Sequence, residues 1–180
     1  MLKFILIGLT AIITIFLIVA AFQPADFRIS RTATIAAPAP VVFEHVNNLQ
    51  KWNAWSPWAK LDPNAKNTFA GPQSGVGASF AWAGNNQVGE GKMTITESKP
   101  DELVIMRLEF LKPFTATNTT EFTFKPDGNQ TTVSWTMNGQ NNFMGKCMGL
   151  IMNCDKMVGG QFEQGFANLN QVVTAKTPQS

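Results

Sequence analysis

The feature that most constrains this chain is an uncharged apolar run that extends from Phe4 to Phe22. These nineteen residues are mostly Ile, Leu, Val, Ala and Phe. At about 1.5 Å of rise per residue, a helix of this length spans roughly 28 Å, close to the hydrocarbon thickness of a bilayer. The run therefore predicts a transmembrane helix over residues 1–22 and a separate domain over residues 23–180.

A cleaved signal peptide is the alternative interpretation of the same segment. Its apolar region normally has about 7 to 15 residues before small residues, and the Val-Ala-Ala stretch at 19–21 fits a cleavage site. The run is longer than that, so we favour an uncleaved single-pass membrane anchor. Lys3 precedes the span and Arg28 follows it, so the positive-inside rule gives no clear orientation. The signal-like start favours an extracytoplasmic domain.

The composition argues against several partners and chemistries. Lys plus Arg exceed Asp plus Glu by only 14 to 12, a balance that argues against a nucleic acid as partner. The single histidine, His45, has no second His or Cys nearby, so we expect a partly exposed helix position rather than a metal ligand. Cys147 and Cys154 on one straight helix would have Cα atoms about 10 Å apart, beyond disulfide reach. We expect free thiols, no metal and no cofactor.

Alternating apolar and polar residues predict an antiparallel sheet after the span. Phe27 to Ile35 is the first expected strand, and Val41 to Leu49 is a short helix. Turn residues recur about every ten positions, and such short connections join antiparallel neighbours. Further strands are expected near residues 76–82, 88–97, 103–111, 115–125 and 131–138.

Three tryptophans between the first helix and the sheet form a second distinctive pattern. Trp52, Trp55 and Trp58 are spaced three residues apart, which on a helix makes one aromatic ridge. We favour core packing for this ridge. The alternative is a role at a cavity mouth or at the bilayer interface, where Trp is enriched.

Beyond Asn142 the apolar period becomes helical almost to the end of the chain. The pattern predicts a long C-terminal helix that buries one face against the sheet, with a break near 153–155. Glycines 159, 160 and 165 weaken such a helix, which suggests that other groups approach its backbone closely. Its expected apolar stripe comprises Met144, Met148, Ile151, Val158, Phe162, Phe166, Leu169 and Val173.

The order of these elements resembles the START-like superfamily, also called the polyketide cyclase/dehydrase and lipid transport (SRPBCC) group. The segments at 51–63, 71–78, 88–91 and 156–160 are similar to a membrane-anchored bacterial subgroup, and the resemblance covers about residues 25–175. It implies an α+β helix-grip fold, in which a curved antiparallel sheet wraps around the long C-terminal helix and leaves an elongated apolar cavity. Members bind lipids, sterols, hormones or polyketide intermediates, and only some are enzymes. The resemblance assigns no catalytic residue here.

Two functions follow as hypotheses. The first is an anchored domain that binds a hydrophobic small molecule or lipid between the sheet and the C-terminal helix. The alternative is a polyketide cyclase-like or other acid/base enzyme that uses a buried carboxylate such as Glu90 or Glu109. Glu109 falls on the strand face opposite Met106, so we lean towards a protein that is not an enzyme.

The expected pocket lining consists of apolar residues on the inward faces of the strands and of the helix, with two polar residues among them. Together they form either a filled core or a cavity wall. Arg31 shares a strand face with Ile29 and is either a polar anchor for a ligand or a side chain that extends to solvent at the strand edge. The predicted set is Phe80, Trp82, Met106, Phe110, Phe122, Trp135, Met137, Met148, Phe162, Phe166, Arg31 and Asn118.

Overall fold

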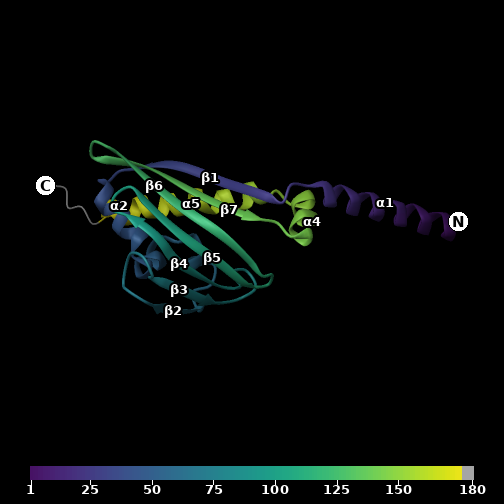
Figure 1. The fold of residues 1–180 in the computed structure, drawn as a ribbon, viewed down its shortest axis with the longest axis horizontal. Coiled ribbons are helices and arrows are strands. Elements are labelled where there is room, and N and C mark those ends of the chain that lie inside the picture. The colour runs from purple at the N-terminus through teal and green to yellow at the C-terminus, as the bar shows by residue number, and fades with distance from the viewer. Residues whose placement is uncertain (176–180) are drawn as a thin grey trace.

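The computed structural model describes residues 1–175 and shows an N-terminal helix that leads into an α+β domain (Figure 1). Helix α1, Leu2–Phe22, projects away from the domain, and Ala20 is its one buried residue. Among the described residues it is the one helix long and apolar enough to cross a membrane, and only 6% of its most apolar stretch of 18 residues is buried. The apolar run thus forms a single continuous helix, as predicted.

The domain is built on one curved sheet of antiparallel strands. Within residues 1–175 the order across the sheet is β1-β7-β6-β5-β4-β3-β2. Six of the strands match the predicted ones, whereas β2 was missed because all five of its residues are exposed and no alternation marks it. The strands are β1 Asp26–Ile35, β2 Lys66–Ala70, β3 Ser79–Ala83, β4 Glu90–Lys99, β5 Leu103–Lys112, β6 Ala116–Asp127 and β7 Gln130–Gln140.

Helices cover one face of this sheet. The long helix α5 packs along β1 and contacts α2, α3 and η2 (Figure 1). A curved antiparallel sheet around a long C-terminal helix is the helix-grip fold expected from the sequence. The helical segments of the domain are α2 Ala39–Asn47, η1 Leu49–Lys51, α3 Trp52–Trp55, η2 Pro57–Lys60, α4 Phe143–Ile151 and α5 Cys154–Ala175.

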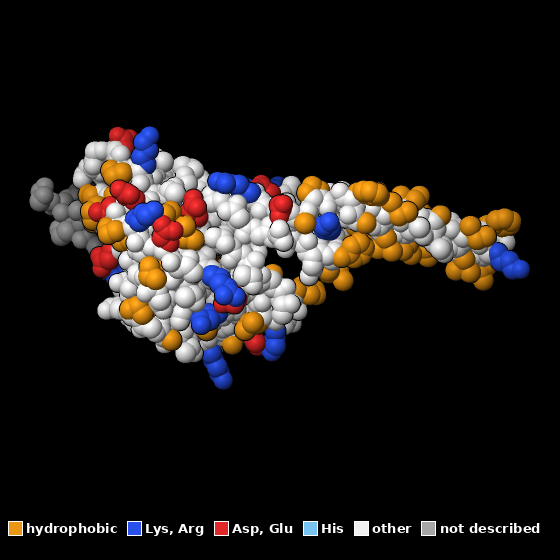
Figure 2. Space-filling model, in the orientation of Figure 1, with side chains coloured by type: hydrophobic (Ala, Val, Ile, Leu, Met, Phe, Trp, Pro, Cys, Tyr) orange, Lys and Arg blue, Asp and Glu red, His pale blue; other side chains and the backbone are white. Residues whose placement is uncertain are grey.

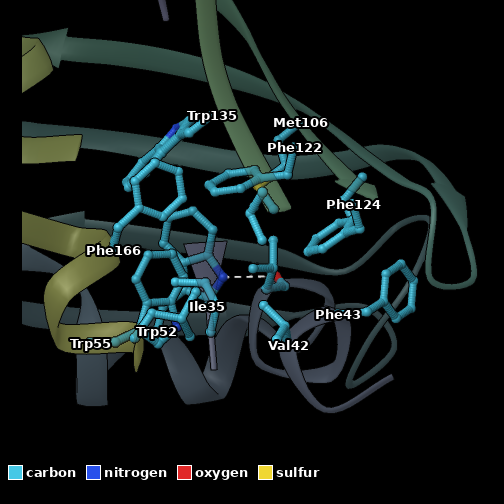
Figure 3. Packing of buried hydrophobic residues seen from close by; sticks show 14 of the residues in the cluster. Ile35, Val42, Phe43, Trp52, Trp55, Met106, Phe122, Phe124, Trp135 and Phe166 are labelled. Carbon is cyan, nitrogen blue, oxygen red and sulfur yellow. Dashed lines mark hydrogen bonds between the residues drawn. The ribbon is translucent and has the colours of Figure 1, made fainter. Parts of the chain in front are cut away.

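The core lies between α5, the short helices and the middle of the sheet. Trp52 and Trp55 are 3% and 0% exposed, and their indole N–H groups donate to the carbonyls of Val46 and His45. This confirms the packing interpretation for both tryptophans. Figure 3 shows them converging with Trp135 and other aromatic rings from the sheet. Trp58 is half-buried.

The C-terminal helix breaks between Ile151 and Cys154, close to the predicted position, but the expectation that its whole apolar stripe packs on the sheet is wrong. Met152 has an extended backbone that ends α4, and the Asn153 side chain accepts the Lys156 N–H at the start of α5. In the α5 part of the stripe, Phe162, Phe166, Leu169 and Val173 are buried as predicted, and Val158 is half-buried. Within α4, by contrast, Met144 and Ile151 are 53% and 71% exposed. Helix α4 lies beside α1 instead of on the sheet.

Candidate functional site on the concave face of the sheet

The pairing register places the predicted strand residues on one face of the sheet. Residues directly opposite each other in an antiparallel pair project to the same side. Phe122 lies opposite Trp135, and Trp135 lies opposite Arg31, so all three share the face covered by the helices. We call it the concave face. It carries nine of the twelve predicted residues: Arg31, Phe80, Trp82, Met106, Phe110, Asn118, Phe122, Trp135 and Met137.

The central part of the concave face is filled. The Trp135 ring stacks on Phe162 of α5 at 4.1 Å between centroids and lies 4.7 Å from Phe122. Phe122, Met106, Phe162 and Phe166 are at most 3% exposed, like the neighbouring Trp135. Figure 3 shows Trp135, Phe122 and Phe166 gathered in this core. The central residues are therefore packed core.

The end of the concave face nearest α1 is open. We call this end the open part of the concave face, defined by half-buried apolar residues that stand in two rows across the sheet. Trp82 packs edge-on against Phe110 at 6.1 Å and donates its N–H to the Val88 carbonyl. The space-filling view shows an opening between α4 and the body of the domain (Figure 2). The residues of the open part are Phe27, Phe80, Trp82, Leu108 and Phe110.

Asn118 brings a polar group to the edge of this open part. Its side chain is 7% exposed and its Nδ2 contacts the Met137 sulfur at 3.8 Å, whereas its Oδ1 has no hydrogen-bond partner among the described residues. Gly139 leaves room for it, because a Cβ built there would overlap Oδ1. An unpaired buried carbonyl costs about 1–3 kcal/mol. The edge of the open part therefore holds one buried acceptor without a partner among the described residues.

Two further buried polar atoms lie outside the open part. The Trp135 indole N–H has no partner among the described residues and belongs to the filled core. His45 is 4% exposed, which corrects the expectation of a partly exposed position. Its Nδ1 lies 2.8 Å from the Val41 carbonyl, while its Nε2 has no partner in the described part of the chain. His45 is buried because it stands on the face of α2 that packs into the core.

Arg31 of β1 forms ion pairs with two carboxylates of α5. Its guanidinium lies 2.8 Å from carboxylate oxygens of both Asp155 and Glu163. The hydrogen bond from Arg31 lowers the pKa of Asp155 below its ordinary value. A Cβ built on Gly159 would overlap the guanidinium, so this glycine allows Arg31 to cross the helix. Arg31 is therefore held by protein carboxylates near the helix and lies apart from the open part.

Met148 is the one predicted helix residue that lies away from the sheet. It is 37% exposed on α4, because the break after Ile151 turns that helix towards α1. Phe27 and Leu108 were missed as site residues. Both stand on the concave face in the same alternation that identified Met106, so the sequence signal for them was present.

The two carboxylates considered for acid/base chemistry are each paired with a basic side chain. Glu109 stands one residue from Phe110, so it points to the opposite face, where its carboxylate contacts Arg107 at 2.8 Å. Glu90 lies at a register shift next to Gly91, and its carboxylate lies 2.8 Å from the Lys112 ammonium. Within residues 1–175 no cluster of three His, Cys, Asp or Glu residues is placed to hold a metal.

Comparison with known proteins places the chain in a family. The family model described as polyketide cyclase/dehydrase and lipid transport matches residues 26–174, and the chain belongs to that family. No curated protein matches the chain in sequence. The family and the fold together indicate a ligand-binding or polyketide cyclase-like domain.

Solved structures share the fold at low identity. Protein MLL2253 from Mesorhizobium loti is 14% identical with a TM-score of 0.63, and the match covers 84% of this chain and 100% of that one. The Zhui aromatase/cyclase from Streptomyces sp. R1128 is 13% identical with a TM-score of 0.59, covering 86% and 97%. Ara h 8.0201 is 8% identical with a TM-score of 0.58, covering 84% and 99%. Such identities show the fold alone.

Proposed function

We propose that the protein is a membrane-anchored domain that binds a hydrophobic small molecule or lipid on the open part of the concave face. Residues 1–22 serve as the single-pass anchor and residues 23–180 as the binding domain. The exposed, uncharged α1 supports the anchor, because a helix so apolar and so little buried is costly in water. The family and the half-buried apolar rows support the binding role.

The unpaired Oδ1 of Asn118 is the observation that carries this proposal. Ligand sites are mostly apolar and contain a few polar groups that fix orientation. A hydroxyl or N–H group of a ligand would satisfy Oδ1, while its apolar remainder would lie against Leu108 and Phe110. We therefore expect a mostly apolar ligand with one hydrogen-bond donor, close to Asn118.

The remaining predicted residues take different roles in this proposal. Phe122, Trp135 and Met106 form the solid floor behind the site, because they are fully packed. Phe80 and Trp82 form the wall on the β3 side. Their truncation is expected to affect binding more than stability, whereas truncation of the floor affects stability first.

A matched pair of fluorescent probes tests the proposal. The domain from Gln23 is suitable, because it contains the whole family match at residues 26–174. We expect saturable binding of 1-aminoanthracene, and weaker binding of its N,N-dimethyl analogue, which lacks the N–H donor. One neutral hydrogen bond is worth about 1 kcal/mol, or roughly fivefold in Kd. Asn118→Leu should remove this difference, and Asn129→Ala in the exposed β6–β7 turn should preserve it.

Two results would refute the binding proposal. One is the absence of saturable binding for either probe. The other is an equal loss of affinity for both probes in Asn118→Leu, since the asparagine would then shape the site without forming a hydrogen bond to the probe's N–H.

Membrane extraction tests the anchor separately. We expect the full chain to remain in the membrane pellet after an alkaline wash, because α1 is held by the hydrocarbon core. Recovery in the supernatant with Phe22 or Gln23 as the new first residue would show a cleaved signal instead. The extracytoplasmic placement of the domain stays a prediction, which protease protection of sealed vesicles would check.

A further inference from the structure

Exposed apolar side chains of the domain gather at the end from which α1 leaves. Among residues 23–175, twelve large apolar side chains are exposed, and seven of these belong to α4 or to the hairpin that joins β5 and β6. The remaining five stand on other elements of the domain. The seven are Leu111, Phe114, Phe143, Met144, Met148, Leu150 and Ile151. A concentration of this kind marks an interaction surface.

The two segments lie at the same end of the fold. At one end of the sheet, Asp26 of β1 pairs with Gln140 of β7, and Glu90 of β4 pairs with Lys112 of β5. Strand β6 pairs with both β5 and β7, so these strand ends lie at the same end of the domain. The β5–β6 hairpin begins there, and α4 follows directly after β7. Figure 1 shows both segments at the end of the domain that continues into α1.

Helix α4 is joined to the end of the apolar span. It packs against α1. The Lys146 ammonium lies 3.5 Å from the Ala21 carbonyl, and the neighbouring Ala20 is fully buried. Because the uncharged run ends at Phe22, the middle of α4 stands at the level where the span would leave the hydrocarbon core. Apolar colour continues from α1 onto the surface beside α4 (Figure 2).

The chemistry of α4 suits a lipid surface. Met144, Met148 and Ile151 follow at spacings of four and three, which makes one exposed apolar stripe. The helix has no acidic residue, and its one charge is Lys146, so anionic headgroups meet no repulsion. A helix that lies in the plane of the interface buries its apolar side at the boundary between headgroups and acyl chains.

We propose that α4 and the β5–β6 hairpin rest on the bilayer surface as a second membrane contact, which seats the domain with the open part of its concave face towards the lipid. This inference rests on the proposed anchor, because α1 fixes the distance to the membrane. A domain on a free tether would expose the seven apolar side chains to water. Burial of these side chains in the interface removes the free-energy cost of their exposure to water. It also turns the open part of the concave face towards the bilayer, where hydrophobic molecules are dissolved.

Spin labels on the full chain in lipid nanodiscs test this surface. The background carries Cys147→Ala and Cys154→Ala, and the discs contain phosphatidylcholine with phosphatidylglycerol. Labels at Met144→Cys and Phe114→Cys report the proposed contact, and a label at Asn129→Cys, in the turn at the other end of β6 and β7, reports water. The measurement is the collision rate with oxygen, which concentrates in lipid, relative to a water-soluble nickel complex.

We expect a several-fold higher oxygen-to-nickel ratio at positions 144 and 114 than at 129. A label at Ile12→Cys within α1 tests the membrane anchor independently of the proposed surface contact. If Ile12→Cys reports lipid while 144 and 114 resemble 129, the surface contact is wrong and the anchor stands. If Ile12→Cys reports water, both fail. Shielding of 144 from both reagents, together with dipolar broadening, would show a second copy on this surface and would also overturn the proposal.

Discussion

Asn118→Leu is expected to stabilise the domain while it weakens ligand binding. Leucine has a similar shape and size, so it fills the space beside Gly139 without leaving a cavity. The substitution removes a buried carbonyl that has no partner among the described residues, which costs about 1–3 kcal/mol, and loses one long contact to the Met137 sulfur. We therefore expect the free energy of unfolding to rise by about 1–2 kcal/mol. For a domain of this size the Tm should rise by roughly 2–8 °C.

A second buried asparagine provides the control. Asn168 is 4% exposed and fully used, because its Nδ2 donates to the Trp55 carbonyl at 2.9 Å and its Oδ1 accepts from Gln164 and Lys60. Asn168→Leu should therefore lower the free energy of unfolding, since it leaves the Trp55 carbonyl unpaired. Urea unfolding of the domain from Gln23, followed by tryptophan fluorescence, gives both values. If both variants are destabilised alike, Oδ1 of Asn118 is paired in the folded protein and the argument for a polar ligand anchor fails.

Three further changes test other parts of the account. Trp82→Ala should raise the Kd for 1-aminoanthracene more clearly than it lowers the Tm, because this side chain is only half-buried; a loss of the full core magnitude, about 3–5 kcal/mol, would make it core. Gly159→Ala should lower the Tm by displacing Arg31, whereas Gly160→Ala meets open space and should raise stability by up to about 1 kcal/mol; equal effects would contradict the close approach. Asp155 has a lowered pKa in the folded state, so its contribution to stability is complete above its unfolded pKa and is lost as pH falls through the folded value. Asp155→Asn should therefore reduce the pH dependence of the free energy of unfolding, measured in urea, between about pH 5 and pH 3. An unchanged pH dependence would refute the pairing with Arg31.

The faces of the strands could be predicted from the sequence because the period of two is local. Met106 and Phe110 alternate with polar neighbours, and one face of their strand had to be buried. Local turns then allowed only antiparallel neighbours, and the register confirms that the predicted strand residues share one face. Which part of that face is filled depends on where α5 lies, and this is a tertiary property that no local pattern records.

The position of α4 could not be predicted from its own sequence. Met144 and Met148 continue the apolar period that buries Phe162, so the pattern alone cannot distinguish a helix that packs on the sheet from one that packs beside α1. The partners of Arg31 were hidden for a similar reason. Asp155 and Glu163 are more than 120 residues away in sequence, and only the helix crossing at Gly159 brings them to the strand.

The burial of His45 depended on a partner that sequence reasoning did not provide. Its helix turns one side into the core, and the ring is accommodated because the Val41 carbonyl lies one turn earlier. Strand β2 was missed because an exposed edge strand carries no alternating burial. The case of β2 shows that a local apolar pattern identifies strongly amphipathic elements and overlooks one that is entirely exposed.

Native mass spectrometry of the purified full chain, released from nanodiscs without denaturation, tests whether the domain binds an apolar ligand. We expect a bound apolar molecule in about one copy per chain, displaced by 1-aminoanthracene and depleted in Asn118→Leu, while Asn129→Ala retains it. A chain that carries no bound molecule and shows no saturable uptake of 1-aminoanthracene would contradict the claim. The open part of the concave face would then be an exposed surface without a ligand.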